Sequence, residues 1–119
     1  MAQKLREGQL DVAILLTEAA TLFAHKGDVT IVGSFVDTPL TWGVHALAGS
    51  KPSLDSTYAV SRMGSGSHLM VLVAARQRKA PDPEFVVVGD LQGARKALEN
   101  KDTDLFMWEK FTTKPLVDS

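Results

Sequence analysis

The chain contains no cysteine among its 119 residues. Disulfides, thiolate metal sites and a cysteine nucleophile are therefore excluded. Long apolar runs are missing as well, because none reaches the roughly 20 residues that a membrane-spanning helix needs. The N-terminal stretch MAQKLREGQLDVAILL has a short apolar part that ends in Thr17-Glu18, and it lacks a small-residue cleavage site. We therefore expect mature sequence rather than a signal peptide, and no direct membrane insertion.

Neither sign of charge is in excess. The 13 Lys and Arg side chains stand against 14 Asp and Glu, which gives a net charge of −1. Both signs are interspersed, so the basic footprint of a nucleic-acid-binding protein is missing and we expect no nucleic-acid partner. With 45% hydrophobic residues the chain can build a packed core, and its length fits one domain or two incomplete halves of something larger.

Segments with strand character alternate with segments of helical character. The run LDVAILL at residues 10–16 is apolar almost throughout, as in a strand buried on both faces of a sheet. The other expected strands are residues 30–36, 41–47, 58–62, 85–88 and 105–108. Helices are expected at residues 18–25, 67–78 and 91–100, with a helical turn at 113–117 that has Pro115 in its opening turn. This alternation predicts an α/β fold with a parallel or mixed sheet and flanking helices.

The most informative stretch is YAVSRMGSGSHLMVLVAA, residues 58–75. A strand that turns through small residues into a helix leaves the first N–H groups of the helix unpaired, at the positive end of its dipole. Ser65 or Ser67 could cap this helix, and the glycines would let a ligand approach the backbone. The turn therefore indicates a small-molecule site, although such turns are more often only tight connections.

Other polar and aromatic residues collect where the expected strands end. In open α/β sheets, ligands bind at the carboxyl ends of the strands, so this convergence favours one shared site. The predicted ligand-binding residues are Thr17, Glu18, Thr41, Trp42, Gly64, Ser65, Gly66, Ser67, His68, Trp108 and Glu109. We expect Glu18 and Glu109 to face the same cleft as His68.

Each of these residues also has a simpler interpretation. Glu18 and Glu109 could cap helices, and the two tryptophans could belong to the core. His68 could cap the helix that follows it.

Chemistry at the turn is poorly supported by the sequence. His25 and His45 stand at no metal-ligand spacing from His68, so we expect no metal, and no cofactor is indicated. Ser65 or Ser67 would need activation by His68 to act as a nucleophile, and no third orienting acid is evident. We therefore expect a protein that is not an enzyme.

Four segments, LREGQLDVAILLTE, PLTWGV, SRMGSGSHLM and DLFMWEKFTTKP, resemble in that order the type-two periplasmic-binding-protein fold. The nearest branch is that of nitrate, taurine and thiamine-precursor solute-binding proteins. The resemblance implies two α/β lobes joined by a hinge, with the solute in the cleft between them. Residues 1–48 then correspond to the end of the first lobe and the crossover strand, 49–56 to a linker, and 57–119 to most of the second lobe. The chain resembles a partial two-lobe protein, about half of the usual length.

The resemblance implies the substrate-binding component of an ABC transporter, which holds a small polar, anionic or heterocyclic solute and meets membrane subunits of the transporter. An enzyme related to thiamine-pyrimidine synthesis is an alternative, but such enzymes carry a Cys-rich motif that is missing here. A metabolite-sensing regulatory domain is a third reading. The protein would be periplasmic if a signal is encoded upstream and cytoplasmic as the chain stands. Because the sheet would lack closing strands, we also expect self-association through an exposed sheet edge.

Overall fold

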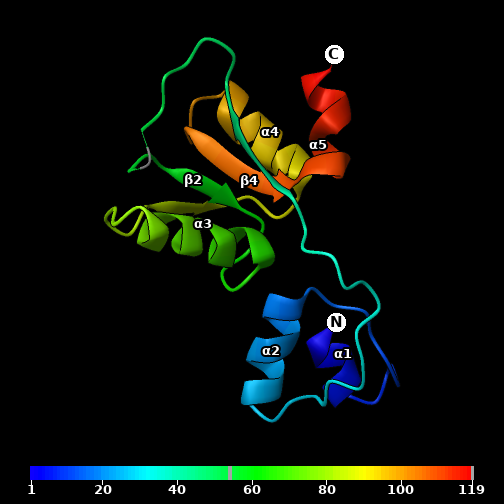
Figure 1. The fold of residues 1–119 in the computed structure, drawn as a ribbon. Coiled ribbons are helices and arrows are strands. Elements are labelled where there is room, and N and C mark those ends of the chain that lie inside the picture. The colour runs from blue at the N-terminus through cyan, green and yellow to red at the C-terminus, as the bar shows by residue number, and fades with distance from the viewer. Residues whose placement is uncertain (54, 119) are drawn as a thin grey trace. The chain divides into compact units, whose positions relative to one another are not determined.

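The computed structural model describes residues 1–53 and 55–118, and the chain divides into two compact units, residues 1–39 and residues 40–119 (Figure 1). No helix within the described residues is long and apolar enough to cross a membrane. The predicted linker at 49–56 joins two strands of the second unit, and its residue 54 lies outside the described residues. The assignment of residues 1–48 and 57–119 to two lobes stays a prediction.

The first unit contains two helices, α1 (Ala2–Arg6) and α2 (Thr17–His25). Helix α2 confirms the helix expected at residues 18–25. Helix α1 was not predicted, although Ala, Gln, Lys, Leu and Arg are all good helix formers. An ion pair of 3.4 Å between Arg6 and Asp28 ties α1 to the segment after α2.

The two strands expected in this unit are wrong. Residues 10–16 and 30–36 form neither helix nor strand. Large apolar side chains in both segments lie exposed, among them Val12, Ile14, Val32 and Phe35. An apolar run becomes a strand only when another strand accepts its backbone hydrogen bonds, and the described residues of the chain supply none to these segments.

The second unit is built on a four-stranded sheet. Its strands are β1 (Trp42–Ala46), β2 (Tyr58–Val60), β3 (Phe85–Val87) and β4 (Leu105–Glu109). They lie in the order β1-β4-β2-β3, with β1 antiparallel to β4 and the other two pairs parallel. All four were expected from the sequence, and the mixed sheet is confirmed.

Three helices complete this unit: α3 (Gly66–Gln77), α4 (Leu91–Glu99) and α5 (Lys110–Val117). Helix α5 begins three residues before the expected helical turn, so Pro115 is its sixth residue instead of lying in its opening turn. Proline has no N–H, so Pro115 cannot donate the helical hydrogen bond to the carbonyl of Phe111, and this short helix has one backbone hydrogen bond fewer at that point.

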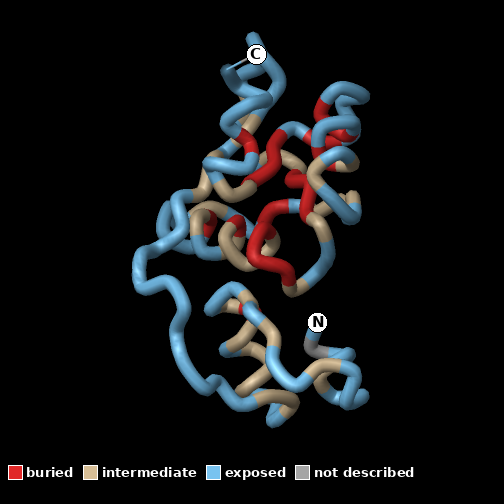
Figure 2. Tube along the Cα trace, turned by 90° about the vertical axis from the view of Figure 1, so that its right-hand side faces the viewer, coloured by how far each residue is buried: buried red, intermediate tan, exposed pale blue. Residues whose placement is uncertain are grey.

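Side chains alternate between the two faces of the sheet and fill two core clusters. Tyr58, Leu105 and Met107 pack with Val71 of α3 on one face. On the other face, Ala59 and Phe106 pack with Ala94 and Leu98 of α4. Figure 1 shows α3 and α4 on opposite sides of the sheet. The buried residues of the sheet lie on β2 and β4, and Figure 2 shows the buried positions along the chain. The second unit is therefore a three-layer α/β structure.

Candidate ligand-binding site

The strand order reverses direction between β2 and β4. From β2 the chain runs through α3 to β3 on one side, and then through α4 back across β2 to β4 on the other. Since β2 and β4 are parallel neighbours, their carboxyl ends lie at the same edge of the sheet. Helices α3 and α5 begin at this edge, so it is the topological switch point where open α/β sheets bind ligands.

The serines of the turn at residues 64–68 hold the start of α3. Ser65 is the N-cap, and its Oγ accepts a hydrogen bond of 3.3 Å from the N–H of His68. The Oγ atoms of Ser65 and Ser67 are 2.9 Å apart, and Ser67 Oγ also accepts from the N–H of Ser61 at 3.4 Å. Both serines are buried. Of the two capping candidates, Ser65 is therefore the one whose hydroxyl caps the helix, and Ser67 supports it.

His68 fixes the turn from its other side. Its Nδ1 accepts a hydrogen bond of 3.0 Å from the N–H of Gly64, whose φ of 77° lies in the left-handed region that favours glycine. The edge of the ring packs against Phe85, with the ring centroids 4.6 Å apart. Because Nδ1 accepts, a neutral His68 carries its proton on Nε2, which can donate to another group. Both Ser61 and Phe85 were missed by the sequence analysis, since neither residue type marks a site.

Two backbone groups of the turn have no hydrogen-bond partner within the described part of the chain. The N–H groups of Gly66 and Ser67 form no hydrogen bond with residues 1–53 or 55–118. Both residues are buried. An N–H at a buried position is costly to leave unpaired, so a water or a ligand is expected to accept from these two groups.

Glu109 caps α5. Its carboxylate accepts from the N–H of Phe111 at 2.8 Å and from the N–H and hydroxyl of Thr112 at 2.9 Å each. These hydrogen bonds hold the pKa of Glu109 below its ordinary value of 4.5. The start of α5 is thus occupied by the chain's own carboxylate, and a role of Glu109 in ligand binding stays a prediction.

Both tryptophans are partly buried. Trp42 packs against the core cluster on the α3 face, whereas Trp108 packs against the cluster on the α4 face. The two rings therefore contact the core on opposite faces of the sheet, and their role in ligand binding stays a prediction. The carbonyl of Thr41 accepts a hydrogen bond of 2.9 Å from the N–H of Lys110, which ties the start of β1 to the start of α5.

The structure thus gathers most of the predicted residues at one edge of one sheet. Thr17 and Glu18 belong instead to the first unit, where they begin α2 and do not end a strand. Their part in the site, including the expectation that Glu18 and Glu109 face one cleft, stays a prediction.

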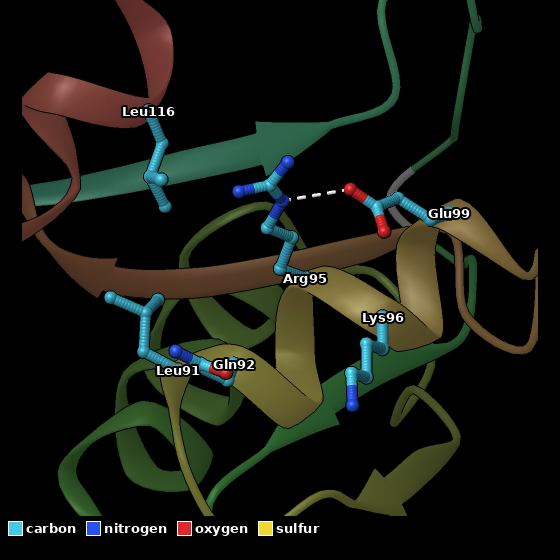
Figure 3. Close-up of a pocket in the computed structure, with 6 residues that line it drawn as sticks. All are labelled: Leu91, Gln92, Arg95, Lys96, Glu99 and Leu116. Carbon is cyan, nitrogen blue, oxygen red and sulfur yellow. Dashed lines mark hydrogen bonds and ion pairs between the residues drawn. The ribbon is translucent and has the colours of Figure 1, made fainter.

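Two hollows elsewhere on the second unit were not foreseen from the sequence. One, of about 320 Å³, lies between α4 and α5, and Figure 3 shows Leu116 and Leu91 pointing toward one another across it. Arg95 at this groove is paired with Glu99 at 2.7 Å. The other, of about 230 Å³, is lined by residues 47 and 50–52 and by Leu98, Lys101, Thr103 and Asp104. Neither contains a predicted ligand-binding residue, so the candidate site rests on the strand ends alone.

A three-layer α/β unit with a mixed sheet and a capped helix at its switch point is typical of a lobe of a periplasmic-binding-protein fold. Comparison of the sequence with known protein families identifies one family within this class. Residues 44–119 match a family model described as Ca3427-like PBP, and the chain belongs to this family. The periplasmic-binding-protein resemblance is therefore confirmed.

A solved structure agrees with this assignment. The chain is similar to the Candida albicans CA3427 gene product, described as defining a new family with the generic periplasmic binding protein fold. The two are 33% identical with a TM-score of 0.89 over 98% of this chain and 42% of the Candida protein. The chain thus spans less than half of that protein's length. No curated protein sequence matches the chain.

Proposed function

We propose that this chain is part of a solute-binding protein that holds a small polar, anionic or heterocyclic molecule at the carboxyl edge of β2 and β4. The N–H groups of Gly66 and Ser67, which have no partner among the residues that the structure describes, carry this proposal. They lie at the start of a 12-residue helix, directly after the left-handed Gly64, where the positive end of the helix dipole favours an acceptor.

The solute in this proposal belongs to the nitrate, taurine or thiamine-precursor group, and the protein serves as the binding component of an ABC transporter. The segments SRMGSGSHLM and DLFMWEKFTTKP support this choice, because they carry the turn and the start of α5 that form the proposed site. Thr17 and Glu18 of the first unit remain proposed ligand-binding residues, and membrane subunits of the transporter would be the protein's partners.

Binding without chemistry is part of the same proposal. The hydroxyls of Ser65 and Ser67 are engaged in capping and in each other, and Nδ1 of His68 accepts from Gly64. Neither serine therefore has the hydrogen bond to a base that a nucleophile needs.

Fluorescence of Trp42 and Trp108 offers a direct test, because these are the two tryptophans of the chain. Trp42 lies at the start of β1 and Trp108 near the end of β4, and both positions are at the edge of the sheet that carries the site. Nitrate, taurine and a pyrimidine thiamine precursor would be titrated separately, and calorimetry would confirm any response. We expect saturable binding of one of the three.

The variant Gly66→Val should weaken that binding at least tenfold. Gly66 is a buried helical position, and a branched valine side chain there would occupy the space beside the two N–H groups. Thermal unfolding measured in parallel would show that the variant is folded under the conditions of the titration. Gly33→Val, at an exposed position in the first unit, is the control and should bind like the wild type. Equal affinity of the wild type and Gly66→Val would place the solute elsewhere.

A further inference from the structure

The hydrogen bond between Gly64 and His68 can form in only one protonation state of the histidine. The N–H of Gly64 donates to Nδ1 of His68 over 3.0 Å, so this ring nitrogen must present its lone pair. A protonated imidazole carries a hydrogen on both of its nitrogens. In that state two donors would face each other, and they would have to separate.

The His68 ring is held in place by contacts with two other elements. The backbone N–H of His68, in the first turn of α3, donates to the Oγ of Ser65 over 3.3 Å. The ring of Phe85 on β3 stands at 81° to the His68 ring, and the two centroids are 4.6 Å apart. These contacts keep Nδ1 beside the turn, so a proton on this nitrogen acts directly on the N–H of Gly64.

Gly64 depends on this one acceptor. Its N–H has no other hydrogen bond with the described part of the chain, and its φ of 77° lies in the left-handed region. The next residue is held independently, because the N–H of Ser65 donates to the carbonyl of Arg62 over 3.1 Å. Loss of the Nδ1 acceptor would therefore release Gly64 without breaking the backbone hydrogen bond of Ser65.

No charged side chain among the described residues forms an ion pair or a hydrogen bond with His68. The charged and titratable side chains on the turn, on α3 and on or next to the strands beside it are Tyr58, Arg62, Arg76, Glu84 and Glu109. The carboxylate of Glu109 is occupied by the N–H groups of Phe111 and Thr112. Protonation of His68 would therefore be coupled to the hydrogen bond of Gly64 and not to a salt bridge.

We propose that His68 is a proton-sensitive positioning residue of the turn at residues 64–68: neutral His68 holds Gly64, and protonated His68 releases it. Histidine is the side chain that ordinarily changes its charge between about pH 5 and 8. The turn leads directly into Gly66 and Ser67, so the N–H groups of the solute site would lose their fixed position at the acidic end of this range. This last step rests on the proposed function, whereas the release of Gly64 does not.

Nuclear magnetic resonance of the 119-residue chain without solute tests the switch. The ring ¹⁵N shifts at about pH 7.5 should show the proton of His68 on Nε2. The hydrogen-exchange protection factor of the Gly64 amide should fall about fivefold or more between about pH 7.5 and about pH 5. The amide of Gly93 is the matched control, because it donates over 2.8 Å to the side-chain carboxylate of Asp90, and its protection should change less than twofold.

Two variants separate the acceptor from the proton. His68→Asn keeps an acceptor oxygen near the position of Nδ1 but has no titratable ring, so the Gly64 amide should stay protected at both pH values. His68→Phe keeps a ring beside Phe85 and removes the acceptor, so the amide should be poorly protected at both.

Three results would each overturn the proposal: a proton on Nδ1 near neutral pH, constant protection of Gly64 in the wild type, or the wild-type pH profile in His68→Asn. The expected pattern in a chain that binds none of the three candidate solutes would support the switch and contradict the proposed function. The two proposals can therefore fail separately.

Discussion

The two units of this chain differ in how far they bury their apolar residues. In residues 40–119, apolar side chains lie between a sheet and helices on both of its faces, and both core clusters are found there. In residues 1–39, Ala19 is the one buried apolar residue among those described. Yet the segment LDVAILL is more apolar than LFMWE of β4. Hydrophobicity therefore makes a core only where a second layer covers it.

The N-termini of the helices also differ between the two units, because side chains cap them in the second unit and not in the first. The three helices of the second unit begin at side-chain caps, Ser65, Asp90 and Glu109. Helices α1 and α2 of the first unit begin at Met1 and Leu16, whose side chains make no capping bond. The second unit is thus specified both by local signals and by packing, whereas the first has little of either.

The largest effect should come from separating the units. Residues 40–119 expressed alone should unfold cooperatively, with a midpoint within about 5 °C of the whole chain, because both core clusters lie inside this segment. Residues 1–39 alone should be largely disordered, since they bury too little apolar surface to offset their conformational entropy. Circular dichroism and amide NMR spectra of both segments would decide this. A cooperative unfolding transition in residues 1–39 would show that the first unit folds by itself, and the contrast between the two units would be wrong.

The next largest difference between the two units should be the loss of stability when a glycine is replaced by alanine, which adds one methyl group. A Cβ at Gly93 would lie 2.1 Å from the carbonyl oxygen of Val88, so Gly93→Ala should destabilise the second unit by about 3 kcal/mol. The same change at Gly33 meets nothing within 4 Å. Gly33→Ala should therefore stay within about 0.5 kcal/mol of the wild type. Urea unfolding measures both, and equal costs would mean that the two units are equally well packed.

Helix caps give a smaller and finer test. The Oδ1 of Asp90 accepts a hydrogen bond of 2.8 Å from the N–H of Gly93, and Asp90→Ala should cost about 1 kcal/mol in urea unfolding. The side chain of Leu16 makes no capping hydrogen bond at the start of α2. Leu16→Ser should therefore raise helicity, because the serine hydroxyl can accept a hydrogen bond from a backbone N–H in the first turn of the helix. Far-UV circular dichroism would detect this gain. A loss of helicity would show that the Leu16 side chain contributes more than a cap would.

Local patterns explain which parts of the fold were predictable. The strands and helices of the second unit follow from alternating or helical spacing bounded by glycine and proline, and the start of α3 follows from its Gly-Ser-Gly-Ser sequence. Residues 10–16 and 30–36 have an equally good strand pattern. Their failure to form strands could not be foreseen, because pairing depends on other segments and not on the run itself.

The candidate site was predictable to the same extent. The helix start at the carboxyl end of a strand was foreseen from local sequence, and so was the alternative role of Glu109 as a cap. The hydrogen bond from Gly64 to Nδ1 of His68 and the contact of His68 with Phe85 were not foreseen. They depend on a side-chain orientation and on the pairing of β2 with β3, which no short motif encodes.

The smallest predicted effect is a pH dependence that belongs to the second unit alone. His45 lies on β1 with its ring stacked on Phe106 at 4.6 Å, and its buried Nε2 has no hydrogen-bond partner among the described residues. Burial lowers the pKa of His45 below its ordinary value of 6.5. The unfolded chain therefore binds more protons than the folded one just below pH 6.5.

It follows that the free energy of unfolding should fall as the pH drops below 6.5, until the folded chain is protonated too. His45→Phe keeps a ring on Phe106 and should flatten this slope. Urea unfolding at a series of pH values between about 5 and 8 would measure the wild type and the variant. If His45→Phe kept the wild-type slope, the pH dependence would have to arise from other groups, and this difference between the two units would disappear.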